Sequence, residues 1–459
     1  MIADAAFLAW LFLQVQVPGL AVHASGLTGQ GAGLTAQGAG LTTQGAGLTA
    51  QGRAGSGPHA ADGLRQEPPA PAQDSGGEAK FNPAIAVIPD VAYYNDNRDG
   101  EASDLVSDAD GFARHAAGEG HVHGGGLERG FTLREVEVSF SGAVDPYFDA
   151  QAILAIGDGE VEAEEVYVQT RALAPGLQLR AGKFYSGIGY LNAKHPHQWD
   201  FVDRPLPYSH LLGGGINEAG LQVTWLPALP VYVLVGGELL QGTNDAFARQ
   251  LGPSEADGFA EKAGPRLLTG FVKVSPNLGD SHTLQAGASV ARSRLHQEFA
   301  EGDEGDEPIE GTGTMLGADL VYQYDSGRQW GVGDVTLQGE YFRRRQDLAL
   351  VMGGAGAERD RTQDGFYLQG TYGFAARWKA GLRFDAAGLA NEVRTGAGRL
   401  DLESVRRYTA ALTFLPTEFS RLRVQYTRAD SPVGGVREKA SQLWVQLQIS
   451  LGAHGAHVF

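Results

Sequence analysis

The sequence contains no cysteine, only 3 methionines among 459 residues, and fewer basic than acidic side chains. Without cysteine there are no disulfides and no thiolate metal sites, so imidazole and carboxylate groups would have to bind any metal. The formal net charge of −18 argues against nucleic acid as a partner, because phosphates would be repelled. No G-x-S-x-G, P-loop or HExxH motif occurs, and we therefore expect no enzyme activity.

Long apolar runs are also missing beyond the N-terminus. Residues 5–22 are mostly apolar, and Val22-His23-Ala24 places small or modest residues at the key positions of a cleavage site. We interpret residues 1–24 as a secretory signal peptide, although no Lys or Arg precedes the apolar stretch. A membrane-anchoring helix is the alternative, but the stretch is short for a span. No other segment holds about 18 consecutive apolar residues, which excludes a bundle of membrane helices.

Residues 25–80 are rich in glycine, alanine and proline. A seven-residue repeat runs through residues 26–53 as GLTGQGA, GLTAQGA, GLTTQGA and GLTAQGR. A period of seven is typical of coiled coils, but each unit holds at least two glycines, and glycine costs about 1 kcal/mol per helical position relative to alanine. We therefore predict a disordered linker that is dispensable for the folding of the rest of the chain.

From Phe81 onwards, apolar and polar residues alternate in segments of about ten residues. In the last segment Leu443, Val445, Leu447 and Ile449 are aliphatic, whereas the positions between them are mostly polar. About 9–11 residues is the length that a tilted strand needs to cross a bilayer. We predict sixteen strands, at residues 81–94, 131–143, 147–156, 161–171, 177–185, 218–226, 231–241, 267–275, 282–294, 314–325, 331–344, 364–374, 377–387, 404–415, 420–428 and 441–452.

The connections between these segments alternate between short and long. The short ones contain Pro, Gly and Asp, as tight turns do, and only the connection at 157–160 is short where a long one is expected. Short periplasmic turns, long extracellular loops and an even strand number are typical of outer-membrane barrels. We therefore predict that residues 81–459 form an all-β, transmembrane antiparallel β-barrel in the bacterial outer membrane, in contact with lipid and lipopolysaccharide. The long connections are 95–130, 186–217, 242–266, 295–313, 345–363, 388–403 and 429–440.

Three parts of the sequence resemble the bacterial outer-membrane porins, and most of all the phosphate-selective porin-like group: GFTLREVEVSFSGAVDPYFDAQAIL (130–154), the segment 161–205 and the terminal Phe459. The resemblance covers residues 81–459, with the departure that His457 stands where an apolar residue is expected. It implies a channel for passive diffusion of small hydrophilic solutes, assembled as a homotrimer. It also implies that the loop after the fifth strand folds into the lumen and narrows it. The loop residues at this constriction are Lys194, His195, His197, Asp200, Asp203 and Arg204.

Strand alternation places charged side chains on the lumen face. Three neighbouring strands contribute most of a basic wall, and one residue joins it from across the pore. Glu135, Glu137 and Glu165 face inward on the opposite side. We interpret this as a transverse field that makes the pore anion-preferring, whereas the alternative is that the charges only solvate a wide lumen. The basic residues are Arg180, Arg377, Lys379, Arg383, Arg407, Arg421 and Arg423.

Histidines in the loops suggest a metal site. His195, His197 and Asp200 supply two imidazoles and a carboxylate, which is a donor set suited to a divalent cation. The alternative is that these side chains pin the loop to the barrel wall through hydrogen bonds. Other loop and tail histidines are His115, His121, His123, His454 and His457.

The segment 298–311 holds seven carboxylates in fourteen residues. We interpret it as a solvated loop, with weak Ca²⁺ or Mg²⁺ bridging to lipopolysaccharide as the alternative. For the whole chain, the alternative to a channel is a barrel plugged by its own loops, which binds divalent metal or has a structural role in the envelope.

Overall fold

The computed structural model describes residues 83–452, apart from a few short gaps. All described residues belong to one compact unit. The predicted signal peptide and linker lie outside the described residues, as does the terminal Phe459. So do His115, His121, His123, His454 and His457. The gaps are 99–104, 107–108, 113–128, 158, 172, 255, 303–304, 353–357 and 397.

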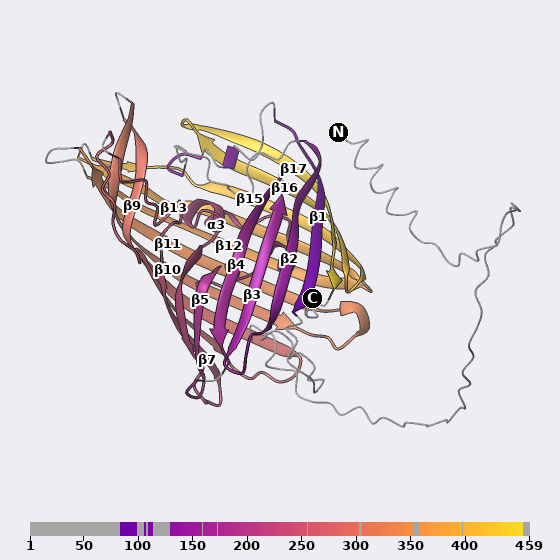
Figure 1. Cartoon of the computed structure of the whole chain (residues 1–459). Coiled ribbons are helices and arrows are strands. Elements are labelled where there is room, and N and C mark those ends of the chain that lie inside the picture. Colours follow the sequence, from indigo (N-terminus) through magenta and orange to yellow (C-terminus); the bar gives the residue numbers. More distant parts are fainter. Residues whose placement is uncertain are drawn as a thin grey trace, which may run out of the picture. The chain divides into compact units, whose positions relative to one another are not determined.

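The predicted sixteen-stranded antiparallel barrel is confirmed. Each wall strand pairs with the next one along the chain, and the ring closes where β1 pairs with β17, with Tyr94 opposite Trp444. Closure matters because an open sheet edge would leave backbone groups unpaired in hydrocarbon. Figure 1 shows the strands slanting around the ring.

The first eight wall strands are β1 (Ala84–Asp96), β2 (Gly130–Ala143), β3 (Phe148–Gly157), β4 (Glu160–Thr170), β5 (Leu177–Tyr185), β6 (Asn217–Trp225), β7 (Tyr232–Leu240) and β8 (Leu267–Ser275). The other eight are β9 (His282–Gly302), β10 (Gly305–Tyr324), β11 (Val335–Leu350), β12 (Arg359–Ala375), β13 (Trp378–Thr395), β15 (Val405–Thr417), β16 (Ser420–Val433) and β17 (Val436–Ile449). Two short strands, β14 (Gly398–Asp401) and β18 (Leu451–Gly452), add to the ends of β13 and β1.

The predicted ends of β2 to β8 agree with the structure to within one residue, but β9 to β13 run much further than predicted. The predicted acidic loop 298–311 is a hairpin of β9 and β10, apart from the undescribed residues 303–304, and Glu298 forms an ion pair with Arg361 of β12. The prediction failed because a strand beyond the membrane has no lipid on its outer side. Its outward positions can then be polar, and the alternation disappears.

The outer face of the wall is apolar. Exposed apolar side chains lie along the strands in the region where lipid would contact them. Trp225, Phe374 and Phe419 are exposed near the short turns, as in an aromatic girdle. None of the described helices is both long enough and apolar enough to cross a bilayer. Exposed leucines of the strand interiors include Leu221, Leu316, Leu320, Leu368 and Leu382.

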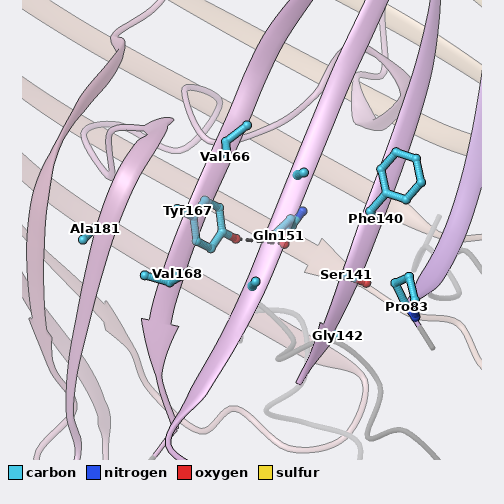
Figure 2. A pocket seen from close by; sticks show the side chains of 11 residues that line it. Pro83, Phe140, Ser141, Gly142, Gln151, Val166, Tyr167, Val168 and Ala181 are labelled. Atoms are coloured by element: carbon cyan, nitrogen blue, oxygen red, sulfur yellow. Dashed lines mark hydrogen bonds between the residues drawn. The ribbon is translucent and has the colours of Figure 1, made fainter. Parts of the chain in front are cut away.

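A shallow groove of about 280 Å³ lies in the wall at β2 to β5. Its lining combines small side chains such as Ala150 and Ala152 with the larger Phe140 and Val166, as Figure 2 shows for the labelled residues. Tyr167 also lines it, and the Tyr167 hydroxyl donates a hydrogen bond to Gln151 at 2.9 Å. Small residues therefore leave this part of the wall recessed.

The hydrophobic core lies inside the barrel. We call residues 186–216, which connect β5 to β6, the inner loop; it contains the short helices η2 (Pro196–Gln198) and α3 (Leu206–Leu211). Helix α3 contacts β11, β12 and β13 (Figure 1). Buried loop residues such as Leu206 and Tyr208 pack with inward-facing wall residues such as Phe342. The lumen at this level is therefore filled by packed side chains.

Candidate functional site

The inner loop carries backbone groups that its burial shields from water, so the wall must supply their hydrogen-bond partners. At the start of the loop the partners are carboxylates. Glu340 of β11 accepts hydrogen bonds from the backbone N–H groups of Tyr190 and Leu191 at 2.8 and 2.9 Å. Glu238 of β7 accepts one from the backbone N–H of Gly187 at 2.9 Å. We call Glu238 and Glu340 the carboxylate anchors.

Further along the loop the partners are guanidinium groups, which donate to backbone carbonyls. Arg423 donates to the carbonyl of Trp199 at 2.7 Å, and Arg421 donates to the same carbonyl at 3.2 Å. Arg421 also donates to the carbonyl of His197 at 2.9 Å. We call four of the guanidinium groups that donate to loop carbonyls the arginine anchors: Arg383, Arg407, Arg421 and Arg423.

Asp203 of the loop lies between two of these anchors. It forms ion pairs with Arg383 at 2.9 Å and with Arg407 at 2.6 Å, and it accepts a hydrogen bond from Gln425 at 2.7 Å. Burial acts to raise the pKa of Asp203, but the two guanidinium groups outweigh burial and hold this pKa well below its ordinary value. Asp385 of β13 pairs with the same two arginines, so the four charges form one network.

Two of the predicted basic lumen residues lie apart from the arginine anchors. Arg377 is in the turn between β12 and β13 with a φ of 67°, and its guanidinium lies 4.0 Å from the centre of the Trp330 ring. The predicted strand position of Arg377 is therefore wrong. Arg180 of β5 lies 4.2 Å from the centre of the Tyr167 ring and donates to Gln169 at 3.2 Å, and both of these partners belong to β4.

The other predicted cations are held within the loop region. Lys379 of β13 lies 3.5 Å from Asp200 of the inner loop, and both side chains are partly exposed. Arg204 lies over the ring of Trp199, with its guanidinium carbon 4.8 Å from the ring centre. Burial lowers the pKa of Lys194 from its ordinary value. Lys379 and Asp200 are thus the partly exposed ion pair at the surface of the loop.

The predicted acidic residues are not across the lumen from the basic wall. His197 Nδ1 lies 2.7 Å from Glu137 Oε2, while the backbone carbonyl of His197 accepts a hydrogen bond from Arg421. The two sectors therefore lie close enough for one loop residue to contact both. In the ring, only β17 and β1 separate β16 from β2. Glu135 and Glu165 face the same side as Glu137, and the loop bridges this acidic sector to the arginine anchors.

Two histidines of the loop lie among wall carboxylates. His195 Nδ1 is 3.2 Å from Glu164 Oε2 and 3.6 Å from Glu137 Oε2, and His195 Nε2 is 3.0 Å from Glu165 Oε2. The rings of His195 and His197 are stacked with centroids 5.8 Å apart. Burial acts to lower the pKa of His195, but Glu137 and the hydrogen bonds to the other two carboxylates raise it well above its ordinary value.

The predicted metal ligand set of His195, His197 and Asp200 needs correction. Asp200 pairs with Lys379, whereas Glu137, Glu164 and His195 bring ligand atoms within 4.8 Å of one another. The carboxylates come from strands β2 and β4, which are distant in sequence from the loop. Spacing within the loop could therefore not identify them.

Glu164 escaped the sequence interpretation because of a β-bulge. The register of β3 and β4 shifts at this point: Ile153 pairs with Glu165, and Leu154 pairs with Ala163. The extra residue is Glu164, and both Glu164 and Glu165 are buried. Strict alternation would place one of two consecutive residues in lipid, so only the bulge brings both carboxylates into the lumen.

The carboxylate anchors were also missed, although a signal exists. Glu238 lies in GGELL and Glu340 lies in QGEYF, and each is followed by a residue that faces outward and is exposed, Leu239 and Tyr341. A single acidic residue at an inward position beside apolar neighbours can thus mark a partner for buried N–H groups.

Comparison with known proteins gave one close sequence relative. A protein of Aquifex aeolicus (strain VF5), described as an uncharacterized protein, is 34% identical over 392 residues, which cover 83% of this chain and 80% of the relative. No family model matches the chain.

Among solved structures, the chain is similar to several outer-membrane proteins. A loop-deletion mutant of OmpT from Vibrio cholerae gives a TM-score of 0.49 at 12% identity, covering 81% of this chain and 99% of OmpT. The DcaP channel of Acinetobacter baumannii gives 0.49 at 13% identity, covering 81% and 96%. The anion-selective porin from Comamonas acidovorans gives 0.48 at 12% identity, covering 81% and 99%.

The predicted localisation agrees with the barrel itself: the ring is closed, its outer face is apolar, and its inner face carries charged and polar groups. These properties describe a β-barrel of the bacterial outer membrane. Because the two sequences are 34% identical over 83% of this chain, the chain belongs to the same family as this Aquifex aeolicus protein.

Proposed function

We propose that the chain is an outer-membrane channel for the passive diffusion of small hydrophilic solutes. The observation that carries this proposal is the polar inner face of a closed barrel, on which wall carboxylates and arginines hold the inner loop. A loop attached to the wall at several points narrows the lumen at a fixed place, so a solute must pass the same charged groups each time.

The proposal includes a preference for anions. All hydrogen bonds of Arg423 go to the neutral acceptors Trp199, Gln446 and Thr413, so its charge is compensated only by more distant carboxylates. Acidic residues of the described connections, such as Glu403 and Glu418, are exposed to water, where screening acts over about 8 Å at physiological salt. Charges close to the constriction therefore count for more than the net charge of the chain.

A second candidate is the barrel plugged by its own loops, and the packed interior favours it. The cluster around Leu206, Tyr208, Phe247 and Phe342 is fully or almost fully buried. Such packing is typical of a segment that stays in place. This candidate would have a structural role in the envelope in place of a solute pathway.

Single-channel recording in planar bilayers separates the two candidates. A channel gives discrete conductance steps, and in a salt gradient its reversal potential has the sign of anion preference. A plugged barrel gives no steps when the folded protein is inserted. Heat-modifiable electrophoretic mobility of the same sample shows that the barrel was folded, so a silent bilayer would contradict the channel and support the plug.

We also propose a homotrimer, as the resemblance to porins implies. The recessed wall at β2 to β5, with Ala150, Ala152 and Ala181 lining the groove, would let another barrel approach closely. Light scattering of the protein in detergent, corrected for bound detergent, should then give three times the mass of one chain.

A further inference from the structure

The cluster where the inner loop meets β2 and β4 has the geometry of a metal centre. His195 Nδ1 lies 3.2 Å from Glu164 Oε2 and 3.6 Å from Glu137 Oε2. Around a tetrahedral Zn²⁺ with bonds of about 2.0–2.1 Å, neighbouring ligand atoms lie roughly 3.4 Å apart. These two spacings therefore bracket the spacing of a zinc site. All three side chains are buried, so their positions are set by packing.

We propose that Glu137, Glu164 and His195 bind a divalent transition-metal cation, with Zn²⁺ as the best fit to this donor set. One imidazole nitrogen and two carboxylates are typical of zinc ligands, and with three protein ligands the fourth position is open to water. The imidazole favours Zn²⁺ over Ca²⁺ and Mg²⁺, which prefer oxygen ligands alone.

The groups behind the three ligands are those that a metal centre needs. His195 Nε2 lies 3.0 Å from Glu165, so the ring can bind a metal through Nδ1 while its other nitrogen is held by a carboxylate. The Tyr185 hydroxyl donates to Glu164 Oε1 at 3.1 Å, which leaves Oε2 directed at His195. His197 Nδ1 contacts Glu137 at 2.7 Å through Oε2, the same oxygen that faces His195. Each ligand side chain is thus held by a further contact.

Charge also favours a cation here. Glu135 interacts electrostatically with Glu137 and Glu164, and Glu165 contacts the same imidazole. Carboxylates crowded in a buried site repel one another, and a divalent ion is the most compact way to compensate them. The bulge in β4, which turns Glu164 inward next to Glu165, creates this crowding.

The bound ion would tie the inner loop to the wall at a third kind of anchor. His195 belongs to the loop, whereas Glu137 and Glu164 belong to β2 and β4. Among the described residues, these three form the one group of histidine and carboxylate ligand atoms that could share a metal ion. The ion would therefore link the inner loop to β2 and β4 at this point. This role does not depend on whether the barrel conducts.

Calorimetry with Zn²⁺ on the full-length protein, refolded in detergent, tests the proposal. The wild type should show saturable binding, and His195→Gln and Glu164→Gln should each bind one equivalent less. Glu165→Gln removes only an orienting contact and should weaken this equivalent about 10–100-fold. The number of bound Zn²⁺ equivalents must be compared between wild type and variants, because the chain has 12 histidines and others of them could also bind Zn²⁺.

Two variants serve as matched controls. Asp200→Asn changes a loop carboxylate that pairs with Lys379, and His282→Gln changes a histidine that contacts Tyr322 near a short turn. Both should keep the full number of equivalents. Equal numbers and affinities in the folded wild type, His195→Gln and Glu164→Gln would overturn the proposal.

A measurement on the wild type alone covers the case in which the ligand variants fail to fold. Co²⁺ in a site of low coordination number gives intense visible d–d bands, whereas hexaaqua-like Co²⁺ gives weak ones. We expect intense bands that disappear when Zn²⁺ is added. Weak bands only, or no saturable Zn²⁺ binding by the wild type, would contradict the site whatever the variants do.

Discussion

The start and the middle of the inner loop are held by opposite chemistry. Near Tyr190, at the start, the wall presents the carboxylate anchors, which accept from backbone N–H groups. Near Trp199, in the middle, it presents the arginine anchors, which donate to backbone carbonyls. A carboxylate can only accept and a guanidinium can only donate. At these two places the sign of charge on the wall therefore matches the backbone polarity that the loop turns toward it.

These two parts of the loop also differ in redundancy. Glu340 alone serves the N–H groups of Tyr190 and Leu191 and the hydroxyl of Tyr208. By contrast, the carbonyl of Trp199 accepts from two arginines, Arg421 and Arg423. The start of the loop is thus sensitive to single substitutions in the wall, whereas its middle keeps one donor when the other arginine is lost.

The largest effect should come from Glu340→Ala. It leaves two buried N–H groups without an acceptor, each at a cost of about 1–3 kcal/mol, so the free energy of unfolding should fall by about 2–6 kcal/mol. Chemical denaturation in detergent measures this change. Trypsin should also cut after Lys194, which is half-buried in the docked loop.

Glu340→Gln and Glu418→Ala sharpen the result. Gln keeps one acceptor oxygen, so its effect should be smaller than that of Ala. Glu418 is exposed in the short turn between β15 and β16, and its loss should change stability by no more than about 0.5 kcal/mol. Equal stability of Glu340→Ala and Glu418→Ala would show that Glu340 is not an anchor.

A medium effect should come from the arginine anchors at the middle of the loop, and it should be non-additive. Arg423→Ala alone leaves Arg421 to bind the carbonyl of Trp199, so the loss should be about 1 kcal/mol. The double variant with Arg421→Ala removes both donors, and its loss should exceed the sum of the single losses by roughly 0.5–3 kcal/mol. Strict additivity in denaturation would mean that the two arginines are not a shared reserve, and exposed Arg399→Ala is the control.

The outer face of the wall could be predicted from sequence because lipid is a uniform partner. Leu382 and Tyr408 are outward and exposed in the structure, as alternation requires, since any apolar side chain satisfies acyl chains. The same rule assigned inward positions to Arg383 and Arg407, and both are buried inside the barrel. The face of the wall on which a strand residue lies therefore follows from the two-residue period of the strand alone.

The partners of inward residues could not be predicted in the same way. Arg383 faces inward because of the strand period, but its contact with Asp203 depends on how a loop 180 residues earlier in the chain folds. Glu164 faces inward only because of a bulge, which alternation cannot reveal. The inner loop covers these side chains, so substituting them affects stability as well as selectivity.

The smallest effect contrasts Arg377 with Lys379, which are two residues apart in sequence. Lys379 is partly exposed beside Asp200 of the inner loop, whereas Arg377 lies against Trp330 in the turn. At a distance of about 8 Å in water, one unit charge changes the energy of a passing ion by about 0.5 kcal/mol, which is roughly a twofold change in permeability ratio. If the barrel conducts, Lys379→Gln should therefore shift the reversal potential toward cations, because it removes a positive charge and leaves Asp200 unpaired. Arg377→Gln should leave the reversal potential unchanged, and a larger shift for Arg377→Gln would place the constriction at the turn instead of at the loop.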